Sequence, residues 1–139
     1  YRYLLGAVSI SNDLSLPAKE LLVGFYQKYY GHQHTMVRCR NPYRLRPQGL
    51  EHVNALFSAL DHQQGFVLLE RQWRYLGYVV PVLYKQYTEL TNKGGTVFHG
   101  FNIDPDFNDC IDGLVVVDVT QLTEKKRKRY DLLDHRVSC

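Results

Sequence analysis

The sequence predicts an α+β domain, and three observations lead to this prediction. Near the C-terminal end, two apolar runs flank an acidic connector, as in two neighbouring strands joined by a turn. In the first half, apolar residues recur at three- and four-residue intervals, which is typical of amphipathic helices. At the start, the short apolar run 4–10 reads as another strand. We therefore expect a short mixed sheet with flanking helices and a C-terminal strand pair, in a single domain over residues 1–139.

The first helix is predicted from its ends as well as from its spacing. Ser15 suits the N-cap, where a hydroxyl accepts a hydrogen bond from an early backbone N–H, and Pro17 is tolerated in the first turn. Gly31 is expected to close the helix. Its apolar face is predicted to carry Ala18, Leu21, Leu22, Phe25 and Tyr29.

Three more helices are expected before the strand pair. The second carries Leu50, Val53, Phe57 and Leu60 and should end near Asp61. Residues 66–76 read as a helix, with a strand as the alternative. A further helix should begin with Pro81 in its first turn and stop before Gly94-Gly95, with Leu83, Tyr87 and Leu90 on its buried side.

The C-terminal strand pair is the part of the chain richest in chemical groups. Residues 96–103 and 113–119 are the predicted strands, and the second is apolar enough to be buried on both faces. Asp104-Pro105-Asp106 between them is strong turn chemistry, because proline sets its own φ and aspartate accepts hydrogen bonds from nearby backbone N–H groups. The carboxylates gathered here can bind or deprotonate an amine, or they can simply build the turn.

Three blocks of sequence also resemble a known family. They are Gly100-Phe101-Asn102-Ile103-Asp104-Pro105-Asp106-Phe107 with Asp112-Gly113-Leu114, then Val80-Pro81-Val82-Leu83-Tyr84-Lys85-Gln86-Tyr87, and near the start Gly6-Ala7-Val8-Ser9-Ile10-Ser11. In their order along the chain these blocks are similar to the closing half of bacterial GNAT-type N-acyltransferases that carry the family label hemolysin, relatives of the ornithine-lipid N-acyltransferases. Ala7 stands where that family usually has proline, and residues 32–75 match only loosely.

The resemblance implies a GNAT-like half-domain, the C-terminal part of a longer acyltransferase. The implied reaction transfers a long acyl chain from acyl carrier protein or acyl-CoA, as donor substrate, to the amine of an amino acid such as ornithine. No covalently bound cofactor is implied. Because family members carry further sequence before the first matched block, the resemblance also implies that activity of residues 1–139 alone is in doubt.

Acyl transfer to an amine needs a group that holds and deprotonates the amine and a donor for the oxyanion. Asp104, Asp106 and Asp112 are the candidate carboxylates, and Ser9 is the candidate hydroxyl on the opening strand. For each of them the alternative is a purely structural role in a turn or strand. Candidate substrate-binding residues are a second strand hydroxyl and aromatic side chains, namely Ser11, Tyr84, Tyr87, Phe101 and Phe107.

Other patterns carry less functional information. His99 and Asp104 have a spacing known from glycerolipid acyltransferases, but His99 falls within a predicted strand, so a working dyad is not expected. His32 and His34 lack a third ligand nearby, and the cysteines lack zinc-site spacing, so no metal is expected. The net charge of +3 is too small to indicate nucleic-acid binding.

Basic residues are the remaining feature. The segment 120–139 is expected to be a basic terminal helix or tail, and Lys125, Lys126, Arg127, Lys128 and Arg129 either contact anionic lipid or carrier or are simply solvated. The cluster of Arg38, Arg40, Arg44 and Arg46 has the same two readings. We expect a cytoplasmic protein with peripheral contact to the inner membrane. The alternatives to an enzyme are a module that binds acyl carrier protein or an anionic lipid surface, and a structural domain without a ligand.

Overall fold

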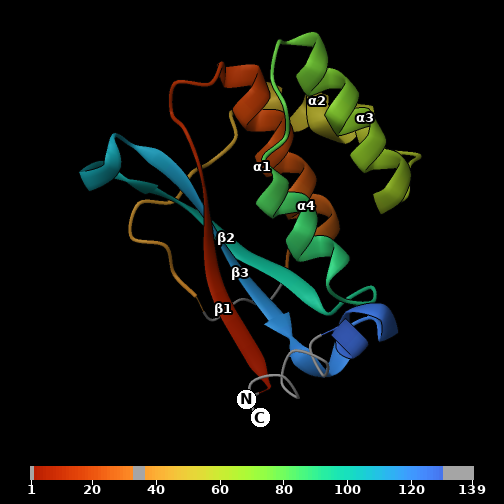
Figure 1. Cartoon of the computed structure of the whole chain (residues 1–139). Coiled ribbons are helices and arrows are strands. Elements are labelled where there is room, and N and C mark those ends of the chain that lie inside the picture. The colour runs from red at the N-terminus through yellow and green to blue at the C-terminus, as the bar shows by residue number, and fades with distance from the viewer. Residues whose placement is uncertain (1, 33–36, 130–139) are drawn as a thin grey trace.

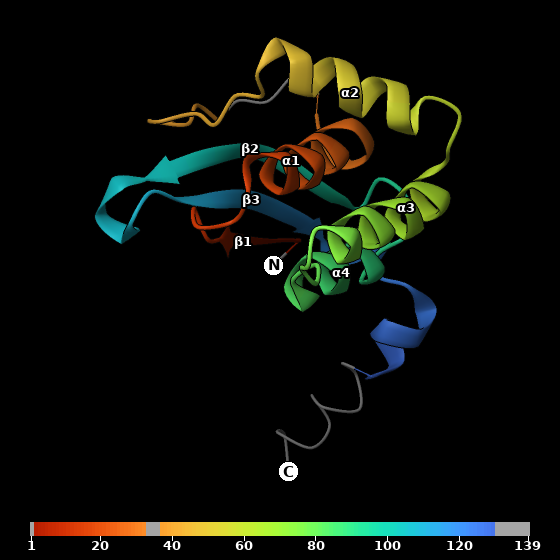
Figure 2. The same cartoon turned by 90° about the horizontal axis from the view of Figure 1, so that it is seen from above.

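The computed structural model describes residues 2–32 and 37–129. Over these residues the chain forms a small antiparallel sheet with four long helices on one side (Figures 1 and 2). The elements in chain order are β1 (Tyr3–Ile10), α1 (Leu16–Tyr30), α2 (Pro47–Phe57), α3 (His62–Tyr75), α4 (Val82–Glu89), β2 (Thr96–Asp104), the 3-10 turn η1 (Pro105–Phe107), β3 (Cys110–Asp118) and η2 (Val119–Gln121). An α+β fold is thereby confirmed.

The sheet has the strand order β1-β3-β2, and both pairings are antiparallel. The prediction of a mixed sheet was therefore wrong. The long helical connection from β1 to β2 can return the chain in either direction, so apolar pattern alone does not set strand polarity. β3 lies in the centre, and its side chains alternate between buried and partly exposed. The expectation that it is buried on both faces was wrong as well, because helices cover only one face.

Helix ends largely follow the predicted capping chemistry. The Ser15 side chain accepts a hydrogen bond from the Ala18 N–H, with Pro17 in the first turn of α1 and Gly31 after its last residue. The second helix ends at Phe57, earlier than predicted, because Asp61 caps α3 in a reciprocal capping box with Gln64. Residues 66–76 are helical as predicted up to Tyr75, where α3 ends.

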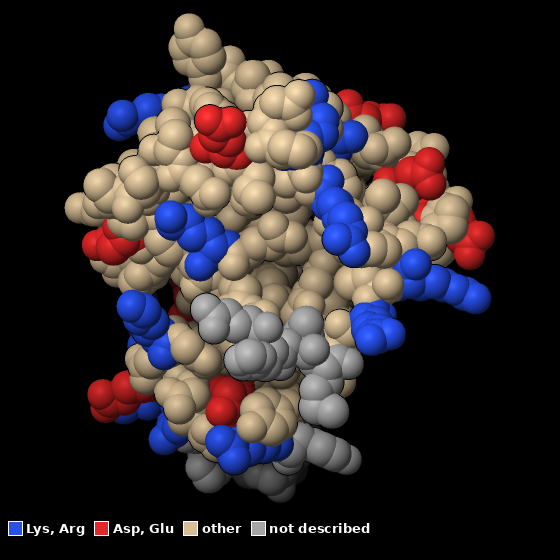
Figure 3. Space-filling view, turned by 180° about the vertical axis from the view of Figure 1, so that it is seen from behind, with Lys and Arg blue, Asp and Glu red and all other residues tan. Residues whose placement is uncertain are grey.

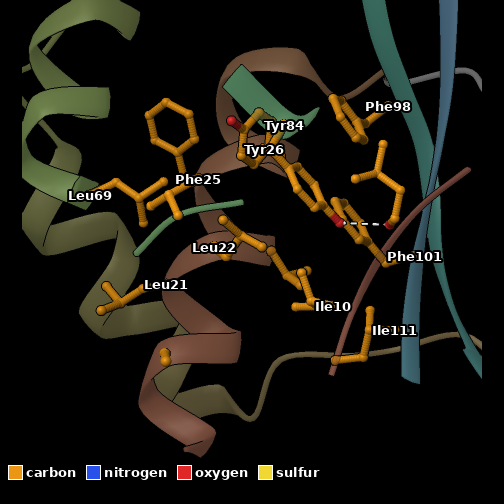
Figure 4. Close-up of a cluster of buried hydrophobic side chains, with 14 of the residues drawn as sticks. Ile10, Leu21, Leu22, Phe25, Tyr26, Leu69, Tyr84, Phe98, Phe101 and Ile111 are labelled. Atoms are coloured by element: carbon orange, nitrogen blue, oxygen red, sulfur yellow. Dashed lines mark hydrogen bonds between the residues drawn. The ribbon is translucent and has the colours of Figure 1, made fainter. Parts of the chain in front are cut away.

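The core lies between the sheet and the helices and is rich in aromatic rings (Figure 4). Tyr26 from α1 packs against both Tyr84 and Phe98, with ring centroids 4.9 Å apart in each case. Tyr84 donates a buried hydrogen bond of 2.9 Å to the Val8 carbonyl, which ties α4 to β1. On α4 the prediction of a buried Leu83 was wrong: Leu83 is exposed, and Tyr84 is the residue that enters the core.

The C-terminal end of the described chain is a short helical segment over residues 124–129. Its side chains are mostly exposed, and Lys128 pairs with Glu124 at 3.3 Å. The predicted basic helix or tail is thus helical over these residues, and the rest of the segment lies outside the described residues. Among the described residues, no helix is long and apolar enough to cross a membrane.

Candidate active site on the open face of the sheet

The face of the sheet opposite the helices presents side chains from all three strands. We call it the open face. The alternating burial of β3 places Cys110, Asp112, Leu114, Val116 and Asp118 there. Strand register brings their neighbours from β1 and β2 to the same side, because directly opposed residues in an antiparallel pair share a face. One end of the open face is therefore polar, whereas the middle is apolar through Ala7, Leu5, Leu114 and Val116.

Ser9 and Asp112 are in direct contact at the polar end. They are opposite each other in the β1–β3 register, and the Ser9 hydroxyl donates a 2.5 Å hydrogen bond to Asp112 Oδ1. The Val119 N–H donates a hydrogen bond to the Arg2 carbonyl. Because bonded residues alternate along an antiparallel strand pair, the backbone hydrogen bonds between β1 and β3 involve residues 2, 4, 6, 8 and 10 of the first strand and its N-terminal extension. Ser9 and Asp112 are therefore a non-hydrogen-bonded pair, in which opposed side chains approach more closely. The structure thus joins two candidate residues that are far apart in the sequence.

Cys110 adds a third group to this cluster. Its thiol donates to Asp112 Oδ1 at 3.5 Å. Burial raises the pKa of the Cys110 thiol, and the hydrogen bond and negative charge of Asp112 raise it further. At neutral pH Cys110 is consequently a thiol, which is a weaker nucleophile than a thiolate. Sequence reasoning missed this residue, although its position two residues before Asp112 on one strand could have placed both side chains on the same face.

The other two candidate carboxylates build the turn between β2 and β3. Asp104 accepts a hydrogen bond from the Asp106 backbone N–H at 3.1 Å and so caps η1. It also lies opposite Cys110 in the β2–β3 register, next to the Ser9–Asp112 pair. Asp106 is exposed in the turn, and the neighbouring Phe107 is 71% exposed. The structure therefore places Asp112 in the cluster, Asp104 at its margin and Asp106 outside it.

Asn102 completes the polar end, and sequence reasoning did not single it out as a site residue. It lies opposite Asp112 on β2 and accepts a 2.7 Å hydrogen bond from the Asn41 N–H. Around it, the Tyr43 N–H donates to the Phe101 carbonyl and the Ile103 N–H to the Asn41 carbonyl. Residues 41–43 thereby cover this part of the outer edge of β2. The polar end is thus held from both sides, by β1 and by this loop.

The outer edge of β1 is different. Because residues of even number direct their backbone groups toward β3, the N–H and C=O groups of Tyr3, Leu5, Ala7 and Ser9 point away from the sheet. Among the described residues, none is joined by a backbone hydrogen bond to another element. This edge runs directly beside the Ser9–Asp112 pair. It offers alternating donors and acceptors to an extended ligand, as an edge strand does.

The predicted substrate-binding residues fall in several places. Tyr84 and Phe101 are buried in the core, and burial raises the pKa of Tyr84 well above its ordinary value. Tyr87 is partly buried beneath β1, near Gly6. Ser11 lies just after β1, where its hydroxyl accepts a bond from the Asp13 N–H. Ser11 is thus nearest to the polar end, whereas Tyr84 and Phe101 pack the layer beneath it.

A hollow of about 430 Å³ lies on the open face away from the polar end, lined in part by Tyr3, Val97, His99 and Val116. His99 stacks on His32 with ring centroids 5.8 Å apart. Burial lowers the pKa of His99, and the charge of His32 lowers it further. Asp104 accepts a hydrogen bond from the backbone of the β2–β3 turn. Within the described residues, no group of three or more ligating side chains could hold a metal ion.

The basic residues singled out in the sequence lie in several places. Figure 3, which views the molecule from behind relative to Figure 1, shows Lys and Arg side chains spread over that side and separated by uncharged surface. Arg46 is committed elsewhere, because it binds the buried Glu20 carboxylate at 2.8 Å. Arg127 donates to the Thr120 carbonyl at 3.0 Å. The expected lipid or carrier contact of Lys125 to Arg129 stays a prediction.

Comparison with known proteins identifies no relative. No family model, curated protein or solved structure matches the chain.

Proposed function

We propose that this chain supplies the amine-acceptor side of an N-acyltransferase, with Asp112 as the group that binds the acceptor amine. The observation that carries the proposal is the contact between Ser9 and Asp112 at the uncovered edge of β1. A carboxylate on an open face attracts an ammonium group and can take up its proton, directly or through a water. Ser9 donates its single proton to Asp112, so it acts as a positioning residue that fixes the orientation of the carboxylate.

The free edge of β1 supports the placement of the donor. Acyl carrier protein and acyl-CoA present their thioester on a pantetheine arm with amide groups. Such an arm can pair with the outward backbone groups of Leu5, Ala7 and Ser9 as an added strand would. One outward N–H of this edge then serves as the donor for the thioester oxyanion. The thioester carbonyl would thereby lie beside Asp112.

The acyl chain has an apolar surface to follow. From Asp112 the open face continues through Leu114 to Val116 and the hollow beside Val97. At about 3.3 Å per residue, Asp112 and Val116 are about 13 Å apart along the strand. A polar end for the amine followed by an apolar strip suits an acceptor or donor with a long hydrocarbon part.

The balance of the reaction is simple. The acceptor nitrogen, freed of a proton by Asp112, attacks the thioester carbonyl. The C–N bond forms, the C–S bond breaks, and the released thiolate takes up the second proton, which the nitrogen loses as it becomes the amide. Because Cys110 stays protonated, direct transfer to the amine is favoured over an intermediate in which the acyl group is carried by Cys110.

The test is an acyl-transfer assay on the purified chain with a long-chain acyl-CoA and ornithine, read by mass spectrometry of the N-acyl product. Asp112→Asn should lower kcat/KM by about 100-fold, the scale of a lost general base. Ser9→Ala should give a smaller loss. Asp106→Asn is the matched control, because its carboxylate lies in the neighbouring β2–β3 turn and outside the cluster, and it should retain activity.

Two outcomes would contradict the proposal. One is an Asp112→Asn variant with full activity. The other is a wild-type chain that neither forms product nor gains thermal stability from ornithine or acyl-CoA. A ligand at one hundred times its dissociation constant should stabilise the fold by about 2.7 kcal/mol, so even a binding-competent but inactive chain would respond in a thermal-shift assay. Stabilisation by acyl-CoA alone that Asp112→Asn leaves unchanged would favour a carrier-binding module.

A further inference from the structure

The connection between α3 and α4, together with the helix ends that it joins, exposes a group of large apolar side chains. The chain reverses direction there: the connecting segment begins at the top of the molecule in Figure 1, at the end of α3, and runs down to α4. Tyr75 is 91% exposed and Val79 86% exposed. We call this group the hairpin tip, and its residues are Tyr75, Leu76, Val79, Val82 and Leu83.

Along this stretch of the chain every charged residue is a cation. From residue 71 to residue 88 the chain contains no Asp or Glu, whereas Arg71, Arg74 and Lys85 fall within this stretch. All three cations are exposed. Arg71 and Arg74 form no ion pair among the described residues, whereas Lys85 pairs with Glu89 at 4.0 Å and lies over the Phe66 ring. The apolar tip is thus bordered by two arginine side chains, Arg71 and Arg74, that are available to a partner.

This combination of features matches a bilayer surface better than a protein groove. The exposed residues lie at the end of α3, in the segment that follows it and in the first turn of α4, and their side chains face solvent. Valine and leucine side chains enter the acyl region, tyrosine favours the headgroup level, and flanking Arg and Lys pair with anionic headgroups. We propose that the hairpin tip inserts into an anionic lipid surface and holds the protein there as a peripheral membrane protein. This inference does not depend on the acyltransferase proposal.

The test uses the whole chain and vesicles of equal parts phosphatidylcholine and phosphatidylglycerol, with pure phosphatidylcholine vesicles as the charge control. The wild-type chain should sediment with the anionic vesicles and at least 10-fold more weakly with the neutral ones. Val79→Asp should reduce anionic-vesicle binding at least 10-fold, because it places a carboxylate at the tip. Phe107→Asp is the matched control: it changes an exposed ring in the β2–β3 turn, outside the tip, and should bind as the wild type does.

Insertion of the hairpin tip into the bilayer is measured at residue 75. Tyr75→Trp adds an exposed indole, whereas the single native tryptophan, Trp73, is buried. Its fluorescence should shift to shorter wavelength when anionic vesicles are added. The proposal is overturned if the wild-type chain does not bind, if Val79→Asp binds normally, or if the Tyr75→Trp emission does not move while binding occurs. It is also overturned if Val79→Asp instead dissociates a dimer in sedimentation velocity, since the tip would then bind a second copy.

Discussion

Two tyrosines touch each other in the core, and removing their hydroxyl groups should change the free energy of unfolding in opposite directions. Tyr26 and Tyr84 are both fully buried, with ring centroids 4.9 Å apart. The Tyr84 hydroxyl donates to the Val8 carbonyl at 2.9 Å (Figure 4). The Tyr26 hydroxyl has no hydrogen-bond partner among the described residues. The two substitutions to phenylalanine therefore remove the same atom from closely similar surroundings.

The expected magnitudes follow from this difference. Tyr84→Phe loses a satisfied hydrogen bond and should lower the free energy of unfolding by about 1 kcal/mol. Tyr26→Phe removes a buried hydroxyl that gave up its hydrogen bonds to water without replacement, a cost of about 1 to 3 kcal/mol. Because Tyr26→Phe removes this cost, the substitution should raise the free energy of unfolding by about 1 kcal/mol. In a chain of this size, each change corresponds to about 3 °C in Tm.

The assay is urea unfolding at neutral pH, followed by the fluorescence of Trp73, which is the only tryptophan and is buried. Neither phenol ionises at this pH, because burial raises the pKa of both Tyr26 and Tyr84. The deciding quantity is the difference in free energy of unfolding between the two variants. Both variants lose one oxygen atom, so the effect of that loss cancels in the difference. If Tyr26→Phe destabilises the protein as much as Tyr84→Phe, or more, then a partner satisfies the Tyr26 hydroxyl and the reasoning is refuted.

Three further predictions concern a glycine, a histidine and a cysteine. Gly49→Ala should lower the free energy of unfolding by about 1 to 2 kcal/mol, because the new methyl group would collide with the buried Glu20 carboxylate. This loss should outweigh the higher helix propensity of alanine. A urea midpoint at or above that of the wild type would contradict the prediction. Since the pKa of His99 is lowered in the folded state, the unfolded state takes up that proton first as the pH falls, so the free energy of unfolding should decrease below about pH 6.5. His99→Gln should flatten this dependence between pH 7.5 and 5.5, and an unchanged slope would count against it. Asp112→Asn should lower the pKa of Cys110, because the negative charge and hydrogen bond of Asp112 raise that pKa. Alkylation of Cys110 by iodoacetamide at pH 8, measured by peptide mass spectrometry, should then be faster than in the wild type. Equal alkylation rates in the two proteins would show that the thiol and the carboxylate do not interact.

Much of the fold could be predicted from the sequence because local chemistry sets it. Ser15 and Gly31 mark the ends of α1 through backbone hydrogen bonding, and Asp104-Pro105-Asp106 builds the β2–β3 turn from its own side chains. The strand pair and the helix through residues 66–75 also follow from spacing and composition. These features depend on contacts between residues close in the chain, so a single sequence contains the needed information.

The sequence predictions were wrong where packing between distant segments determines the structure. Leu83 and Tyr84 are neighbours on α4, and spacing favoured Leu83, but the sheet offers a cavity beside Val8 and Gly113 that Tyr84 fills. Strand polarity and the one-sided burial of β3 likewise depend on where the helices pack. A hydrophobic pattern alone does not say which neighbour covers a given face.

By itself, then, the sequence determined the α+β class, the helix caps and the acidic turn, since each of these depends on residues within a few positions of one another. Only the tertiary structure decided which carboxylate belongs to the candidate site. Asp104, Asp106 and Asp112 look alike in the sequence, yet register places Asp112 against Ser9, a residue more than one hundred positions away, and leaves Asp106 in the turn. The physical reason is that strand pairing brings together side chains that no local pattern relates.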